Sequence, residues 1–197
     1  FEDLQKRIPR EEIDKFNKEI QKIILDLKKN NRSIKAEIVG SYRRGLKSSG
    51  DIDVIITSNN SNDFEKFLEE VSNKNLILHF LSKGPTKSLT IGKLNEESSI
   101  PRRIDFLYSP PNEYAFALLY FTGSKSFNVV MRQHCLDLGY SLNEKDLTNS
   151  NRNFETEEEI FEFLGLEFKK PEDRLNGLSV HLIKNKELDA LKKPVKD

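Results

Sequence analysis

The apolar residues near the N-terminus recur every three or four positions, as they do along one face of an α-helix. They are Ile13, Phe16, Ile20, Ile23, Ile24 and Leu27. Two acids, Glu11 and Glu12, precede them, and two bases, Lys28 and Lys29, follow them. Acids in the first turn and bases in the last turn suit the helix dipole. The pattern therefore predicts an amphipathic helix over about residues 9–29.

Shorter stretches rich in β-branched residues predict strands further along the chain. They span residues 37–39, 51–57, 76–81, 88–94 and 103–108, with an amphipathic helix over 63–71 among them. After the pair Pro110-Pro111, helical periodicity dominates, over residues 113–121, 124–138 and 156–164, with a short strand at 140–142. Strands with helices first and mainly helices later predict an α+β fold of two subdomains, with their boundary at the prolines.

The composition excludes several classes of protein. The chain has 197 residues, of which 36% are hydrophobic, enough for a core that needs neither metals nor disulfides. Cys135 is the only cysteine, which excludes a disulfide framework and a cysteine-rich zinc site. No apolar run approaches the ~18 residues of a membrane span, and the sequence shows no signal-peptide pattern. We therefore expect an intracellular protein without a membrane partner.

The charged residues are segregated along the chain. The 32 basic and 32 acidic residues cancel, and a net charge of zero taken alone argues against a nucleic-acid partner. Segments 32–50 and 82–103 are mainly basic, however, whereas 155–162 holds five glutamates and no base. We therefore expect basic central segments that face nucleic acid and an acidic helix whose glutamates lie in solvent.

Three aspartates are placed where they can bind metal. Asp51 and Asp53 are two positions apart on a predicted strand, so their side chains project from the same face. Asp105 lies in another predicted strand and joins them if the two strands are neighbours. Carboxylate oxygens suit Mg²⁺, and a site with three carboxylates can hold two metal ions.

A candidate anion-binding segment precedes these aspartates. Gly40-Ser41 offers backbone N–H groups and a hydroxyl to a phosphate, and Arg44 can bind a phosphate tail through two hydrogen bonds. Gly45 and Gly50 allow close approach of the backbone. An anion pocket beside paired carboxylates indicates a metal-bound nucleoside triphosphate and therefore nucleotidyl transfer.

The motifs around these residues resemble the active-site signature of the family X (DNA polymerase beta-like) DNA polymerases. The matching segments are Gly40-Ser41-Tyr42-Arg43-Arg44-Gly45 and Ser48-Ser49-Gly50-Asp51-Ile52-Asp53-Val54, with further matches at 7–12, 81–87, 102–105, 120–124 and 171–174. The resemblance implies a nucleotidyltransferase palm at residues 1–111, with a mixed or antiparallel sheet and flanking helices. A small, mostly helical nucleotide-selection subdomain (fingers or thumb) would occupy 112–174, and 175–197 would form a C-terminal tail without a recognised counterpart.

The resemblance also implies a role for each matching position. Asp51 and Asp53 would ligate both metal ions, and Asp105 would ligate the catalytic ion and help to deprotonate the primer 3′-hydroxyl. The nucleotide would be bound by Arg7, Ser41, Arg44, Ser49, Gly50, Tyr120, Phe121, Gly123, Lys125 and Asn128. The DNA would be contacted by Lys83, Thr86, Lys87, Arg103 and Arg132.

Some features depart from the family pattern. Lys125 replaces an acid that flanks the incoming base, and two readings stay open: attraction of the triphosphate or altered base selection. Val129 replaces a lysine near the template, which predicts weaker template contact. Helix-hairpin-helix and lyase-lysine patterns are not found in the sequence. We therefore expect no 5′-deoxyribose-phosphate lyase activity from this chain, and only weak, salt-sensitive binding to DNA.

The implied reaction is addition of a deoxynucleotide to a primer 3′-hydroxyl, with two Mg²⁺ ions or with Mn²⁺ in their place. The implied partners are dNTP and gapped or primed DNA, and the implied process is short-gap filling in base-excision repair. The protein would act as a monomer that contacts other repair proteins, in the nucleus if its source is a eukaryote. Two alternatives stay open: a template-independent nucleotidyltransferase and a catalytically inactive module that binds DNA ends.

Overall fold

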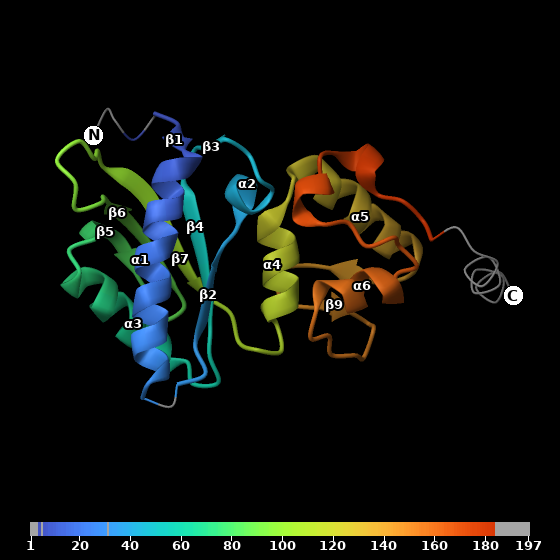
Figure 1. Ribbon diagram of the computed structural model, residues 1–197. Coiled ribbons are helices and arrows are strands. Elements are labelled where there is room, and N and C mark those ends of the chain that lie inside the picture. The colour runs from blue at the N-terminus through green and yellow to red at the C-terminus, as the bar shows by residue number, and fades with distance from the viewer. Residues whose placement is uncertain (1–3, 5, 31, 184–197) are drawn as a thin grey trace, which may run out of the picture.

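The computed structural model describes residues 4, 6–30 and 32–183, so part of the predicted tail, 184–197, lies outside the described residues. Figure 1 shows a sheet with helices in the N-terminal part of the chain and a helical group in the C-terminal part. This arrangement confirms the predicted α+β fold class. Within the described ranges, every helix is too short or too polar to cross a membrane.

Five strands form the central sheet, in the order β2-β4-β7-β6-β5. Their bounds are Lys35–Ile38 (β2), Ile52–Thr57 (β4), Ile77–Lys83 (β5), Lys87–Gly92 (β6) and Arg102–Tyr108 (β7). Strands β4 and β7 run parallel, whereas the other neighbours are antiparallel. The sheet is therefore mixed, and its one parallel pair brings together two strands that are far apart in sequence.

Helices α1 (Arg10–Lys28) and α3 (Asn62–Asn73) cover one face of this sheet (Figure 1). The apolar positions that predicted the first helix are buried against it. Strand β7 alternates between the two faces: Ile104 and Phe106 belong to the core under the helices, whereas Arg103 and Asp105 are half-buried on the other face. The sheet thus uses one face for packing and leaves the other for polar groups.

A second hydrophobic core lies among the C-terminal elements. These are α4 (Tyr114–Thr122), α5 (Lys125–Asp137), α6 (Glu157–Phe163) and the hairpin of β8 (Ser141–Leu142) and β9 (Leu147–Thr148). Helix α4 is apolar on all sides because it packs in two directions. Phe116 and Leu119 belong to the second core, whereas Leu118 packs with Val39 and Ile55 of the sheet region. Helix α4 therefore joins the two groups.

Four short elements complete the architecture. Strand β1 (Ile8–Pro9) pairs with β3 (Ser48–Ser49), which brings the N-terminal segment next to the loop before Asp51. Helix α2 (Gly40–Arg43) is a single turn between β2 and β3. Near the C-terminus, η2 (Pro171–Asp173) and η3 (Gly177–Ser179) are short 3-10 helices.

Candidate active site

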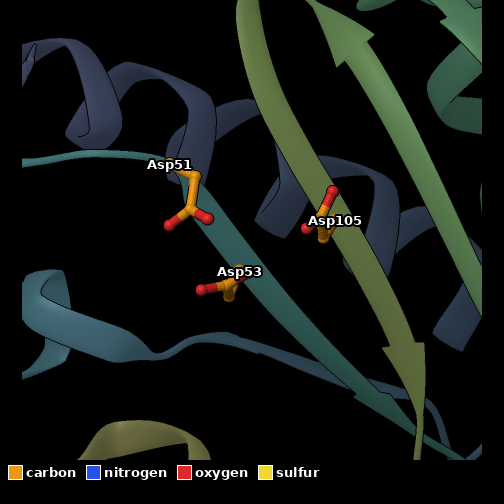
Figure 2. A group of neighbouring side chains, drawn as sticks. All are labelled: Asp51, Asp53 and Asp105. Atoms are coloured by element: carbon orange, nitrogen blue, oxygen red, sulfur yellow. The ribbon is translucent and has the colours of Figure 1, made fainter. Parts of the chain in front are cut away.

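The structure brings together the three aspartates that the sequence singles out (Figure 2). Asp53 on β4 is paired in register with Asp105 on the parallel strand β7, and Asp51 lies two residues earlier. One carboxylate oxygen from each of the three lies within 4.8 Å of the others. Because Ile52 and Val54 point into the core, all three carboxylates emerge on the opposite face of the sheet.

The local electrostatics favour a bound cation. Burial, together with the charges of Asp51 and Asp105, raises the pKa of Asp53 to about 7. Burial also raises the pKa of Asp51, and the charge of Asp105 acts in the same direction. Arg103 supplies one counter-charge, because its Nη2 donates to Asp105 Oδ1 at 2.8 Å. Divalent cations would relieve the remaining repulsion, and the hard oxygen donors fit Mg²⁺.

A turn of the backbone carries the predicted phosphate-binding residues past these carboxylates. Gly40 adopts a φ of +67°, which favours glycine, and a Cβ there would lie 3.6 Å from Asp53 Oδ2. The chain then enters α2, where the Ser41 hydroxyl donates to Ser49 Oγ at 2.6 Å. This bond joins the predicted phosphate-binding turn to the loop that leads into β4.

Arg7 reaches the same loop from the N-terminal segment. Its Nη2 donates to the Ser48 carbonyl at 2.9 Å and its Nε to Ser48 Oγ at 3.2 Å. Its Nη1 lies 3.6 Å from where a Cβ of Gly50 would be. The pairing of β1 with β3 therefore places Arg7, Ser49 and Gly50 beside one another, next to Asp51.

A cavity of about 470 Å³ opens on the C-terminal side of the site. It is lined by Arg44, Tyr120, Phe121, Thr122, Gly123, Lys125, Asn128, Val129 and Arg132. Asn128 Nδ2 donates to the Tyr120 carbonyl at 2.8 Å, and the Arg132 guanidinium lies 6.0 Å from the centre of the Tyr120 ring. Arg44 Nη1 donates to the Thr122 carbonyl at 2.7 Å, and burial lowers the pKa of Arg44. Three cations and no acid are found among these lining residues, so the described cavity suits an anion.

Phe121 connects this cavity to the carboxylates. It also lines a smaller cavity of about 260 Å³, together with Asp53, Asp105 and Lys87. The ring of Phe121 meets that of Tyr120 edge-on, with 5.1 Å between the ring centres. A molecule that occupied both cavities would therefore contact Phe121 in the middle.

The predicted DNA contacts are spread more widely. Arg103 and Arg132 lie at the carboxylates and in the larger cavity, and Lys87 lines the smaller one. Lys83 and Thr86 belong to the β5–β6 hairpin and line neither cavity. Lys83 Nζ lies 4.9 Å from the centre of the Phe80 ring, and the Thr86 carbonyl accepts from the Tyr108 N–H at 2.8 Å.

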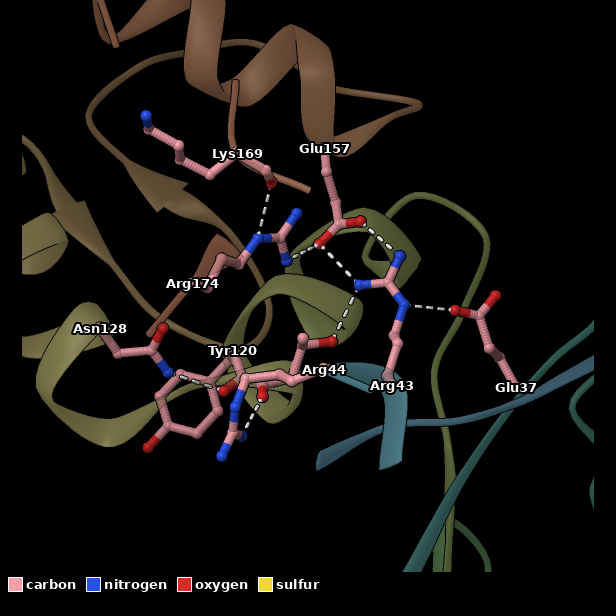
Figure 3. Close-up of polar contacts among 9 residues, drawn as sticks. Glu37, Arg43, Arg44, Tyr120, Asn128, Glu157, Lys169 and Arg174 are labelled. Carbon is pink, nitrogen blue, oxygen red and sulfur yellow. Dashed lines mark hydrogen bonds and ion pairs between the residues drawn. The ribbon is translucent and has the colours of Figure 1, made fainter. Parts of the chain in front are cut away.

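A buried ion triad that the sequence did not reveal holds the two groups of elements together (Figure 3). Glu157 on α6 accepts from Arg43 Nη2 at 2.6 Å and from Arg174 Nη1 at 2.7 Å. Arg43, at the end of α2, also donates to Glu37 at 2.5 Å and to Thr122 Oγ1 at 2.9 Å. The triad thus links the turn that carries Ser41 and Arg44 to the C-terminal helices.

The prediction that the glutamates of 155–162 lie in solvent is therefore wrong at Glu157, which is 6% exposed. The composition of this run does not distinguish one glutamate from the next. Periodicity separates them: Glu157 is three positions before Ile160 and four before Phe161, and both of these are buried. A glutamate on the apolar face of its helix indicates a buried partner, and that signal was present in the sequence.

Comparison with known proteins relates both parts of the chain to one family. Residues 7–111 match the family model of the DNA polymerase beta palm, and residues 117–175 match that of the DNA polymerase beta thumb. The chain is 29% identical over 197 residues to DNA polymerase lambda of Rattus norvegicus, covering 88% of this chain and 34% of that protein. It is 25% identical over 205 residues to DNA polymerase lambda of Arabidopsis thaliana, covering 88% and 37%.

A bacterial protein is similar as well. The chain is 30% identical over 151 residues to the DNA polymerase/3′-5′ exonuclease PolX of Bacillus subtilis (strain 168), covering 75% of this chain and 25% of that protein. The matched part of the chain therefore spans between 25% and 37% of the length of these three relatives.

Proposed function

Because the chain belongs to the family X DNA polymerases, matching both the palm and the thumb of DNA polymerase beta, we propose that it adds deoxynucleotides to the 3′-hydroxyl of a DNA primer. The observation that carries this proposal is the cluster of Asp51, Asp53 and Asp105, with ligand atoms within 4.8 Å of one another. The palm would comprise residues 1–111 and the thumb 112–174.

In this proposal the three aspartates hold two Mg²⁺ ions, which when bound would activate the attacking oxygen and neutralise charge on the leaving phosphates. The primer 3′-oxygen bonds to the α-phosphorus of the dNTP, the bond between that phosphorus and the bridging oxygen breaks, and pyrophosphate leaves. Asp105 accepts the hydroxyl proton. Arg103, which is bound to Asp105 in the structure, positions the primer terminus.

The other residues would contact different parts of the nucleotide. Arg7, Ser41, Ser49 and Gly50 would hold the triphosphate from the palm, and Arg44 would hold it from the side of the thumb. The sugar would contact Tyr120, Phe121 and Gly123, and the incoming base would contact Lys125 and Asn128. Arg132 would reach the template base. Such contacts carry little base-specific information, which suits an enzyme that copies a template, because base pairing supplies the sequence.

The DNA would lie across the polar face of the sheet. Lys83, Thr86 and Lys87 on the β5–β6 hairpin would contact the template backbone, an electrostatic interaction that weakens with salt. Short-gap filling in base-excision repair by an intracellular monomer is the process we propose, since it requires only local contacts with primer, template and nucleotide.

The test is incorporation of a single dNTP on a duplex with a one-nucleotide gap, in Mg²⁺, beside the same primer without a template. We expect extension of the gapped duplex, and a loss of roughly 10³-fold or more in Asp105→Ala, because a metal ligand contributes several kcal/mol to the transition state. Asp26→Ala, which changes an exposed carboxylate on α1, is the matched control and should retain activity.

The other outcomes separate the alternatives. Equal extension with and without a template would identify a template-independent nucleotidyltransferase. Binding of the gapped duplex without any incorporation would identify an inactive end-binding module. Full activity in Asp105→Ala would refute the metal assignment.

A further inference from the structure

The chain that follows Arg174 crosses the start of α5, the helix that lines the larger cavity (Figure 1). The Ser124 hydroxyl donates to the Leu175 carbonyl at 3.0 Å, and the Ser124 N–H donates to the Arg174 carbonyl at 3.4 Å. The same hydroxyl accepts from the Phe127 N–H at 3.2 Å and so caps the helix. The orientation of this cap therefore depends on the residues after 174.

The next residues pack on α5 at very close range. In η3, a Cβ on Gly177 would lie 2.5 Å from Val130 Cγ2 and 3.5 Å from the Ser126 carbonyl oxygen. A valine in a helix is held to one preferred rotamer, so Val130 has little freedom to move aside. Only glycine allows this approach, and η3 therefore lies directly against the first two turns of α5.

The segment is anchored at its far end as well. The Glu167 N–H donates to the His181 carbonyl at 2.8 Å, and the Ile183 N–H donates to the Gly165 carbonyl at 2.9 Å. Val180 packs against the second hydrophobic core. Residues 175–183, which we call the brace, therefore connect the start of α5 to the chain after α6. The match to the thumb ends at residue 175, so nearly all of the brace lies beyond it.

We propose that the brace is a positioning element of the nucleotide site, an inference that rests on the proposed function. Gly123 immediately precedes the Ser124 cap, and Lys125 and Asn128 lie in the first turn of α5; all three line the larger cavity. By holding that turn, the brace keeps these cavity residues in the arrangement that binds dNTP. When only a fraction of molecules has a competent pocket, the apparent dissociation constant rises by the inverse of that fraction.

The brace is tested with Gly177→Ala, whose methyl group would force η3 away from Val130. We expect the KM for dNTP in gapped-duplex extension to rise by roughly threefold or more, with kcat changed by less than about twofold, because saturating nucleotide recovers the competent pocket. Hydrogen exchange of the Phe127 and Asn128 amides, which bond to Ser124, should become faster. A merely structural role would instead reduce the amount of active protein at unchanged KM.

The controls change the contact between Gly177 and Val130 from its other side. Val130→Ala, a change outside the cavity lining, should leave KM unchanged, and Val130→Ala combined with Gly177→Ala should restore both KM and amide protection, because the clash is gone. Leu178→Ala, a change at an 86% exposed side chain of η3, should behave as wild type. If Gly177→Ala does not fold, Val180→Ala loosens the brace without a clash and should raise KM in the same direction.

The proposal is overturned by an unchanged KM with unchanged amide exchange, by a lower kcat at unchanged KM, or by a higher KM that Val130→Ala does not reverse. Failure of the proposed function has a different signature. If the wild type incorporates no nucleotide, that function is wrong, while amide exchange in Gly177→Ala still decides whether the brace holds α5.

Discussion

Glu157→Gln should destabilise the fold strongly, because it removes the carboxylate from a buried ion triad. Glu157 is 6% exposed and Arg174 is 0% exposed, and Arg174 Nη2 has no hydrogen-bond partner among the described residues. Without the carboxylate, two guanidinium groups would face each other with no negative charge between them. Breaking a buried ion pair by removal of one partner costs about 3–5 kcal/mol.

This cost can be expressed as a change in melting temperature. For a chain of 150–250 residues, 1 kcal/mol corresponds to about 2–4 °C, so Glu157→Gln should lower Tm by about 6–20 °C. Thermal unfolding followed by circular dichroism at pH 7 measures this change. Glu158→Gln, a change at the exposed neighbour on the same helix, is the matched control and should shift Tm by no more than a degree or two.

The pH dependence checks the electrostatic origin of the effect. Burial alone would raise the pKa of Glu157, but the hydrogen bonds and charges of Arg43 and Arg174 outweigh it and lower that pKa. A carboxyl with a lowered pKa stabilises the folded state above its unfolded pKa of about 4.5, and this contribution is lost as the pH falls through the folded value. The gap in Tm between wild type and Glu157→Gln should therefore shrink below about pH 4. Equal Tm values for Glu157→Gln and Glu158→Gln at pH 7 would refute this reasoning, as would a gap that is independent of pH.

Two further predictions concern the site itself. Because the folded-state pKa of Asp53 is raised to about 7, the metal-free protein should lose stability as the pH rises from about 4 to 8, and Mg²⁺ should raise Tm at pH 8. Calorimetry should show that both effects are weaker in Asp53→Asn. An equal dependence of Tm on pH in the two proteins would contradict the charge cluster. Lys125→Glu should raise the KM for dNTP by roughly tenfold at low salt and by less at high salt, since it reverses a charge in a cavity lined by Arg44 and Arg132. Steady-state kinetics at two ionic strengths measure this change in KM. A rise in KM that is independent of salt would argue for a steric cause.

The fold was largely predictable because its elements have clear periodicity. The apolar positions of α1 and the alternation of β7 each have the repeat of the structure they form, and the structure places both elements within a residue or two of the predicted bounds. The order of the strands in the sheet was harder to predict. Strand β7 lies between β4 and β6, and only this order, with its parallel register, sets Asp53 opposite Asp105.

Contacts between distant charged residues could not be predicted in the same way. A local window shows that Arg43 and Glu157 are charged, but their 2.6 Å contact depends on how α2 and α6 approach in three dimensions. The pairing of Arg7 with Ser48 has the same origin, because it follows from two-residue strands that are too short to leave a pattern. What the sequence lacks is the long-range packing that decides which partner each charged residue meets.

The triad and the nucleotide cavity are mechanically connected through one turn of helix. Arg43 is the last residue of α2 and Arg44 is the capping residue that follows it, and the two side chains have different partners. Arg43 points to Glu157, while Arg44 bonds to the Thr122 carbonyl at the cavity. Thr122 receives a second bond, from Arg43 to its hydroxyl, so both arginines hold the same residue just before Gly123. Loss of Glu157 removes one support of Arg43 at this junction, so Glu157→Gln should also raise the KM for dNTP, which steady-state kinetics on the gapped duplex measure.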